Sequence, residues 1–166
     1  MTVNPIPTGC NSVNVYLVVK DPRAAIEFYT KAFDGTANLC MEGPDGSVMH
    51  AEVRIGNSTV MVSQENPEWH ALSPEALGGS PASLHLYVDN CDAAFEKAVA
   101  AGCTAVFPVA DMFWGDRYGK VVDPFGYQWG IATHVEDVSE QEMKKRSEAW
   151  FAQMAESQCD GAGGQG

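Results

Sequence analysis

Residues 14–33, NVYLVVKDPRAAIEFYTKAF, share their pattern with residues 83–102, SLHLYVDNCDAAFEKAVAAG, which begin 69 positions later. When the two stretches are superposed, aliphatic and acidic residues coincide: Leu17 with Leu86, Val19 with Val88, Ala24 and Ala25 with Ala93 and Ala94, and Glu27 with Glu96. A shift of 70 also places IGNSTVMV (55–62) on FGYQWGIA (125–132). Self-similarity at a nearly constant offset predicts a duplicated structural unit.

Helix signals occur once in each repeat and once after the second. Asp21 supplies an N-cap and Pro22 occupies the first helical position, while Gly102 is a C-terminal stop for the helix of the second repeat. Ser139 opens a capping box, SEQE. The three predicted helices span residues 22–33, about 90–102 and about 139–156. Beyond them, the glycine-rich residues 157–166 are predicted to be disordered.

Strand patterns fill the segments between the helices. They lie at residues 12–19, 48–55 and 58–63 in the first repeat, and at 83–88, 104–108, 120–122 and 127–133 in the second. Both repeats read strand, helix and then strands joined by turns. We therefore predict an α+β fold of two tandem βαβββ modules plus a C-terminal helix. The single domain divides into module 1 (about 10–70), a linker (71–82), module 2 (about 83–135), the C-terminal helix (about 139–156) and the tail (157–166).

Composition restricts the partners of the protein. Ten Lys and Arg residues against 22 Asp and Glu give a formal net charge of −12, which disfavours binding to nucleic acid or to anionic membranes. No apolar run approaches the length of a membrane span, and the first residues show no secretory pattern. The five cysteines are scattered without a C-x-x-C pair, which argues against disulfides and a thiolate zinc site. We expect a cytoplasmic protein.

Three stretches resemble the vicinal-oxygen-chelate superfamily of glyoxalases, bleomycin-resistance proteins and extradiol dioxygenases, and in particular its PhnB-like branch. They are VVKDPRAAIEFYTKAF (18–33), VMHAEVRIGNSTVMVS (48–63) and FWGDRYGKVVDPFGYQWGIATHVEDVS (113–139). The resemblance implies that the two modules form a curled mixed sheet around a cleft. It also implies that the protein is a homodimer.

Alternation along the strands selects residues for the cleft, because successive side chains point to opposite faces. In VMHAEVRI the apolar set Met49, Ala51, Val53 and Ile55 is predicted to pack on the helices, which leaves the polar set for the cleft. The candidate ligand-binding residues on the strands are His50, Glu52, His85, Tyr87 and the repeat equivalent Tyr16. The alternative is a solvated sheet face with cross-strand ion pairs.

Metal-dependent members that resemble glyoxalase I bind one divalent ion through the first and last strand of each module. The corresponding positions here are Asn14, Ser83, about Val60 and Gly130, which lack the usual His, Glu or Gln donors. We therefore predict no metal and no other cofactor. A displaced divalent-metal site on His50, Glu52 and His85 remains the alternative.

The stretch FWGDRYG (113–119) is a second candidate for ligand binding. Trp114 offers a stacking surface, and Arg117 is a candidate clamp for a carboxylate or another anion, in a tight loop between Gly115 and Gly119. The alternative is an ion pair of Asp116 with Arg117 that pins the loop. Behind it, DPFG (123–126) predicts a type I turn, and alternation along YQWGIAT predicts that Trp129 belongs to the core.

Two functions of different class are consistent with these residues. The first is a metal-free small-molecule binding protein of the glyoxalase/bleomycin-resistance type that holds an aromatic or cationic ligand in the cleft. The second is a metal-dependent lyase, isomerase or dioxygenase with the displaced His/Glu site. A dimeric regulatory module is a third possibility. The sequence leaves the ligand unnamed.

Overall fold

The computed structural model describes residues 3–161, with side chains described as far as Met154. Module 1 comprises β1 (Val15–Val19), α1 (Pro22–Ala32), β2 (Thr36–Glu42), β3 (Val48–Ile55) and β4 (Ser58–Gln64). Module 2 comprises β5 (Ser83–Tyr87), α3 (Cys91–Ala101), β6 (Thr104–Asp111), β7 (Asp116–Val122) and β8 (Gln128–His134). Two short helices, η1 (Pro67–Trp69) and α2 (Pro74–Leu77), lie between the modules, and α4 (Glu140–Gly161) follows them.

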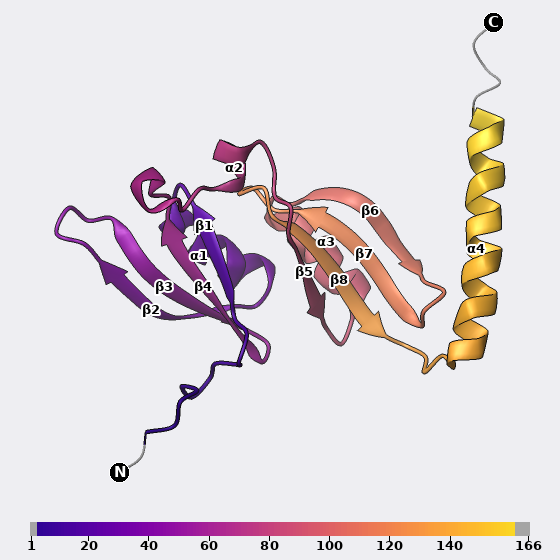
Figure 1. Ribbon diagram of the computed structural model, residues 1–166, viewed down its shortest axis with the longest axis horizontal. Coiled ribbons are helices and arrows are strands. Elements are labelled where there is room, and N and C mark those ends of the chain that lie inside the picture. The colour runs from indigo at the N-terminus through magenta and orange to yellow at the C-terminus, as the bar shows by residue number, and fades with distance from the viewer. Residues whose placement is uncertain (1–2, 162–166) are drawn as a thin grey trace, which may run out of the picture.

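Each module forms its own four-stranded sheet, in the orders β1-β4-β3-β2 and β5-β8-β7-β6 (Figure 1). The first strand of each module is parallel to the last, and the remaining neighbours are antiparallel. The same strand order and directions occur twice. The prediction of an α+β fold with two tandem βαβββ modules and a C-terminal helix is therefore confirmed.

The helices begin where their caps were predicted. The Asp21 carboxylate accepts hydrogen bonds from the backbone N–H groups of Arg23 and Ala24, and Pro22 occupies the first turn of α1. Asn90 caps α3 in the same way by accepting the N–H of Ala93 at 3.1 Å. Side chains that satisfy the free N–H groups of a first turn stabilise a helix start by about 1 kcal/mol.

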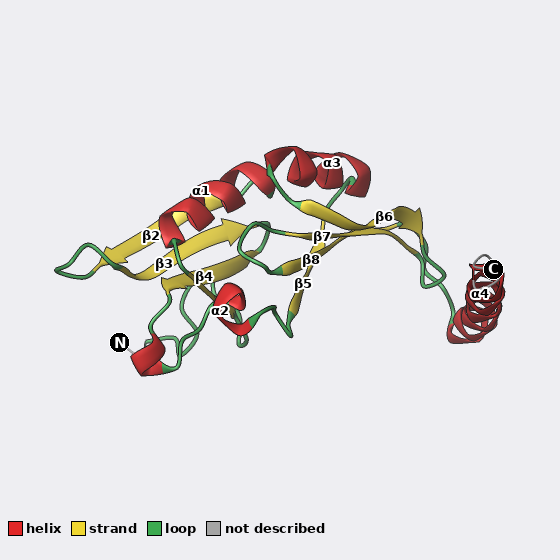
Figure 2. Ribbon diagram, turned by 90° about the horizontal axis from the view of Figure 1, so that it is seen from above, coloured by secondary structure: helices red, strands yellow, loops and turns green. Residues whose placement is uncertain are grey.

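The core lies between these helices and one face of the sheets. Figure 2 shows α1 and α3 side by side above the strands, and the two helices are in contact. Leu17 and Val19 of β1, with Trp129 and Ile131 of β8, are buried beneath them. Trp129 is 2% exposed, which confirms its prediction as a core residue.

The opposite face of each sheet is open. The two sheets lie side by side with the edge strands β1 and β5 next to each other, and they do not close into one curled sheet (Figures 1 and 2). The expectation of one cleft enclosed by a curled sheet is corrected to this extent: a single chain presents two separate open faces. The candidate residues are therefore divided between the two modules.

Asp123 joins the two modules through a buried hydrogen-bond network. Its carboxylate, 4% exposed, accepts the hydroxyl of Tyr29 from α1 and the indole N–H of Trp129 from β8, both at 2.9 Å. Nearby, the Tyr127 hydroxyl bonds to the backbone O and N of Val18 on the edge of β1, at 2.9 and 3.0 Å. The predicted turn at 123–126 is present and is also the centre of the seam between the modules.

The structure corrects several local expectations. A strand at 36–42, β2, was missed, because every residue of this edge strand is exposed and no alternation marks it. Met49 is exposed instead of packed on the helices, because a register shift pairs Met41 with His50 and Glu42 with Val48, which leaves Met49 as a bulge. Gly119 lies inside β7, not in a loop.

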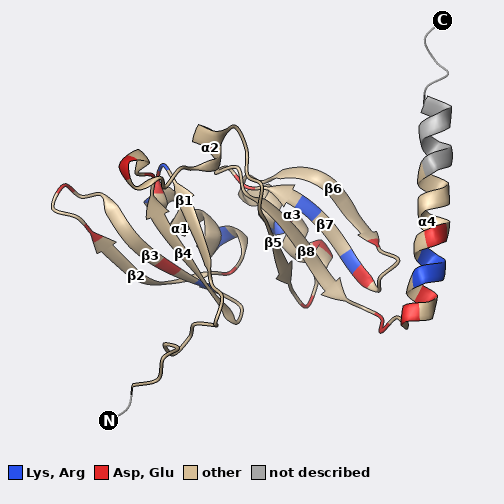
Figure 3. Ribbon diagram, viewed as in Figure 1, with Lys and Arg blue, Asp and Glu red and all other residues tan. Residues whose placement is uncertain are grey.

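The helix α4 stands apart from the sheets at the far end of module 2 (Figure 1). Ser139 caps it as predicted, and it continues to Gly161, beyond the predicted end at Glu156. Residues 162–166 of the predicted tail lie outside the described residues. Acidic and basic side chains share the first turns of α4 (Figure 3), where Arg146 forms an ion pair with Glu136 at 2.7 Å. None of the described helices combines the length and apolar character that a membrane crossing requires.

Candidate functional site

Three of the predicted residues form a connected chain on the open face of module 1. The Tyr16 hydroxyl lies 3.1 Å from Nδ1 of His50, and Nε2 of His50 lies 3.3 Å from Oε1 of Glu52. A carboxylate can only accept, so the imidazole donates from Nε2 and, in its neutral form, accepts the phenol proton at Nδ1. The arrangement is chemically able to pass a proton from the phenol towards Glu52.

The open face of module 2 carries a second pair of rings. His85 stacks on Tyr118 with ring centres 5.6 Å apart and an interplanar angle of 16°, and Tyr87 contacts His85 at 4.8 Å. Gly130 on the neighbouring strand makes this possible, because a Cβ there would lie 2.7 Å from the Tyr118 ring. His85 and Tyr87 also line a hollow of 560 Å³ between the two modules, to which module 1 contributes Val15, Val60 and residues 55–58.

Tyr118 was not among the predicted residues, although the repeat contains a signal for it. Strand pairing places Tyr16 opposite Met61 and His85 opposite Gly130, so that Tyr16 and His85 are equivalent. By the same pairing, His50 in β3 corresponds to Tyr118 in β7. Each face thus carries one tyrosine and one histidine ring at equivalent positions, in exchanged order.

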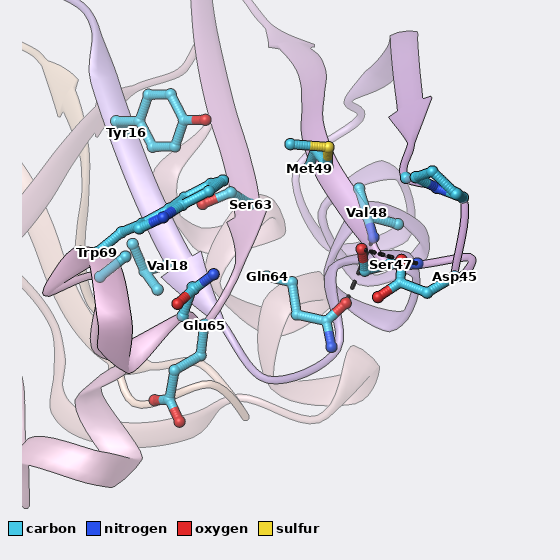
Figure 4. A pocket seen from close by; sticks show the side chains of 14 residues that line it. Tyr16, Val18, Asp45, Ser47, Val48, Met49, Ser63, Gln64, Glu65 and Trp69 are labelled. Carbon is cyan, nitrogen blue, oxygen red and sulfur yellow. Dashed lines mark hydrogen bonds between the residues drawn. The ribbon is translucent and has the colours of Figure 1, made fainter.

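A hollow of 780 Å³ opens beside Tyr16 on module 1. Figure 4 shows the rings of Tyr16 and Trp69 on one side and Met49 with the loop of Asp45 on the other. Trp69 projects from η1 and is 68% exposed. Glu65 lies at the base of the hollow beside Gln64. Trp69 was not among the predicted residues; its signal was a tryptophan after the Asn-Pro pair at 66–67, which caps and opens a short helix.

The two carboxylates of this hollow are acidic groups held in their charged form. Hydrogen bonds from the side chain and backbone of Ser73 lower the pKa of Glu65, and those of Ser47 lower the pKa of Asp45. Both groups therefore carry negative charge at neutral pH. The hollow combines an aromatic wall with fixed negative charge.

Asp116 organises the other predicted aromatics. This carboxylate, 3% exposed, accepts the Tyr87 hydroxyl at 2.9 Å, the Trp114 indole N–H at 3.0 Å and Nδ1 of His134 at 2.8 Å. Burial opposes its ionisation, but these hydrogen bonds outweigh burial and lower the pKa of Asp116. The polar ends of Tyr87 and Trp114 are thus engaged inside the protein, and only their rings remain available.

Arg117 is not brought to either open face. Its guanidinium forms a bidentate ion pair with Asp92 at the start of α3, at 2.5 and 2.6 Å, and a further bond to Asp111 at 3.0 Å. These hydrogen bonds raise its pKa. The ion pair expected with Asp116 is corrected, because neighbouring residues of β7 point to opposite faces and Asp116 lies with the aromatic group. Arg117 pins the strand to α3.

The structure also places the positions that correspond to the metal ligands of metal-dependent relatives. Val60 is 4% exposed and lies in the core. Met61, which pairs with Tyr16, therefore occupies the position on the last strand that was assigned to Val60. In the part of the chain that the structure describes, no group of three or more His, Cys, Asp or Glu side chains is arranged to hold a metal ion. His50 and Glu52 lie on one module and His85 on the other, and a single chain does not bring the displaced metal set together.

Comparison with known proteins assigns the class. Residues 11–131 match the family model of the Glyoxalase/Bleomycin resistance protein/Dioxygenase superfamily, and the chain belongs to this superfamily. An uncharacterized protein of Mycobacterium bovis is 40% identical over 147 residues, which cover 87% of this chain and 94% of that protein.

Two solved structures show how the fold is shared. TioX from Micromonospora sp. ML1 is 26% identical, with a TM-score of 0.58 over 75% of this chain and 99% of that chain. A PhnB protein from Bacillus cereus has a TM-score of 0.56 at 18% identity, over 74% of this chain and 99% of that chain, and so shares the fold. The resemblance to the superfamily, including PhnB-like proteins, is confirmed.

Proposed function

We propose that this is a metal-free small-molecule binding protein of the glyoxalase/bleomycin-resistance type, which holds an aromatic or cationic ligand on the open face of module 1. The observation that carries the proposal is the hollow of 780 Å³ walled by Tyr16 and Trp69 with Glu65 and Asp45 at its margin. Aromatic faces attract flat and cationic groups, and tryptophan is the strongest partner for a cation.

Charge supports a cationic ligand. The lowered pKa values of Asp45 and Glu65 keep two negative charges in the lining of the same hollow. The chain as a whole carries a formal charge of −12, which draws cations towards it and repels anions. A ligand with a positive group and a flat ring satisfies both features of the hollow.

We propose further that the protein is a homodimer, in which a second copy covers the open sheet faces. Large apolar side chains are exposed along the outer strands: Leu39, Met41, Val106 and Phe107. Glu52 and Lys120 occupy equivalent positions on the two faces and carry opposite charges.

The four cysteines in the described residues are free, which is typical of a reducing compartment, and we propose that the protein is cytoplasmic.

Titration calorimetry with three probes tests the binding proposal: benzyltrimethylammonium, tetramethylammonium and benzyl alcohol. We expect the aromatic cation to bind most tightly. Trp69→Ala should weaken it by about 3- to 30-fold, since a cation over an aromatic face contributes about 0.5–2 kcal/mol. Phe151→Ala, which removes another exposed aromatic ring on the distant α4, is the matched control and should leave the affinity unchanged. Equal weakening in both variants, or no saturable binding, rejects the proposal.

The alternative of a metal-dependent enzyme has one observation in its favour, the chain of hydrogen bonds from Tyr16 through His50 to Glu52. A second copy would be needed to bring His85 of one chain near this group. Elemental analysis of protein purified without a metal-binding tag distinguishes the two functions. A stoichiometric divalent metal that is lost in His50→Ala supports the enzyme and contradicts the metal-free proposal.

A further inference from the structure

A third hollow, of 630 Å³, lies at the seam between the modules and away from Trp69. Three connections meet there: the end of α1 at Phe33 and Asp34, the hairpin between β3 and β4 at Gly56, and the link from β5 to α3 at 88–90. Figure 1 shows this hairpin beside the end of β5 where the chain turns towards α3. Of the residues that were predicted to bind a ligand, Tyr87 alone lines this hollow.

Four charged residues line the seam hollow, and only two of them neutralise each other. Lys97 of α3 forms an ion pair with Asp34. Arg54 and Asp89 form no ion pair, either together or with any other residue that the structure describes. The hollow therefore presents one free cation and one free anion at separate positions.

Arg54 is distinguished from the other arginines of the chain. Arg23, Arg117 and Arg146 each form an ion pair with at least one carboxylate. The guanidinium of Arg54 instead donates from Nε to the Gly56 carbonyl at 3.2 Å and from Nη1 to the Gly9 carbonyl at 2.8 Å. These bonds fix its orientation and leave Nη2 and one hydrogen of Nη1 unused in the described structure. Nη2 is therefore available to donate to a carboxylate oxygen.

The remaining lining is mostly apolar. It consists largely of side chains from the helices and from β5: Phe33, Leu86, Val88, Ala93 and Ala94. Such a surface can accept a hydrocarbon group, and burial of each methylene contributes to affinity. Charge of both signs beside an apolar surface defines a ligand with a carboxylate, an ammonium group and an apolar side chain.

We propose that the seam hollow binds a zwitterion of the α-amino acid class with an apolar side chain. The ligand carboxylate pairs with the free edge of Arg54, its ammonium group pairs with Asp89, and its side chain lies against Leu86 and Ala94. This site is separate from the hollow beside Tyr16 and does not depend on the function proposed above. Because it lies between the modules, a bound ligand would contact both.

The test is a chemical-shift titration of ¹⁵N-labelled protein with L-phenylalanine and two analogues that each lack one charge, 3-phenylpropionate and phenethylamine. We expect L-phenylalanine to give the largest saturable shifts, centred on residues 54–56 and 86–94. Arg54→Ala should weaken its binding by about 10- to 100-fold, because hydrogen bonds between charged groups are lost. Asp89→Asn should weaken it by about 3- to 10-fold, since that carboxylate is exposed. The shifts that phenethylamine causes at residues 86–94 should respond to Asp89→Asn and not to Arg54→Ala.

Arg54 also holds the N-terminal arm through Gly9, so a control must separate this role from ligand binding. Thr59 donates its hydroxyl to the same Gly9 carbonyl at 2.8 Å but does not line the hollow. Thr59→Val removes this tether and should leave L-phenylalanine binding unchanged. Loss of binding in Thr59→Val equal to that in Arg54→Ala, binding that both charge variants retain, or an absence of saturable shifts would each overturn the proposal.

Discussion

Replacement of Asp123 by Asn should destabilise the protein through a conflict of hydrogen-bond donors. The two carboxylate oxygens accept four donors: Oδ1 accepts the backbone N–H groups of Phe125 and Tyr127, and Oδ2 accepts the Tyr29 hydroxyl and the Trp129 indole, each at 2.9 Å. An asparagine has one accepting oxygen, and its amide group would face the other pair of donors.

The magnitude follows from which donors can adapt. If the amide oxygen serves the two backbone groups, the Tyr29 hydroxyl can rotate and accept, but the indole of Trp129 can only donate and stays buried without a partner. One unsatisfied buried donor costs about 1–3 kcal/mol, and loss of the charge on its acceptor adds about 1 kcal/mol. We expect the free energy of unfolding to fall by about 2–4 kcal/mol and the melting temperature to fall by about 5–15 °C.

Urea unfolding followed by tryptophan fluorescence measures this loss. Asp111→Asn is the matched control, because Asp111 carries the same group with 76% of its side chain exposed, and it should lose less than about 0.5 kcal/mol. A loss in Asp123→Asn no larger than in this control would refute the assigned role of the buried carboxylate.

The same variant has a pH signature. Burial raises the pKa of Asp123 above its ordinary value of 3.8, although its hydrogen bonds oppose the shift. A raised pKa in the folded state means that the contribution of this group to stability is fully present below 3.8 and is lost as the pH rises through the folded pKa. Asparagine does not titrate. The difference in the free energy of unfolding between wild type and Asp123→Asn should therefore be largest at acid pH. It should decrease, as the pH rises, to the value expected at neutral pH.

Three further predictions concern the seam, the ring pair of module 2 and the end of β8. Tyr127→Phe removes the hydroxyl that bonds to both backbone groups of Val18, and chemical denaturation should show a loss of about 1–2 kcal/mol. Gly130→Ala places a Cβ 2.7 Å from the Tyr118 ring and should displace that ring, which is visible as altered near-ultraviolet circular dichroism with a cost of about 1–3 kcal/mol. Hydrogen bonds to Asp116 and Asp137 raise the pKa of His134 above 6.5. The contribution of His134 to stability is therefore present below pH 6.5 and is lost as the pH rises through the folded pKa. Thermal unfolding of His134→Gln should lack this pH dependence.

The fold could be predicted from the sequence wherever a local rule acts. The strand at 48–55 was predicted to the residue because apolar positions recur every second residue, and the start of α1 was predicted because Asp21 is a capping residue followed by proline. The strand at 36–42 and the spacing between the two sheets have no such local signal. The strand at 36–42 is held by pairing with the adjacent β3, and the spacing between the sheets depends on contacts between segments that are distant along the chain.

The sheet face that carries the candidate residues could be predicted from the sequence, but the residues that they contact could not. Alternation correctly placed Tyr16, His50 and Glu52 on one face, and the structure adds that their polar atoms form a chain. Alternation could not reveal that Arg117 meets Asp92, because that contact depends on how α3 packs on β7. It also gave no reason to choose Trp69, whose exposure results from the short helix η1 between the modules.

The exchanged ring pairs have a consequence for the comparison of duplicated chains. An alignment scores each column separately, so Tyr16 against His85 and His50 against Tyr118 count as two mismatches between the halves. The physical unit, a phenol beside an imidazole, occurs in both halves with the two residues in exchanged positions. A search for compensated swaps of this kind would detect ancient duplications that residue-by-residue scoring discards.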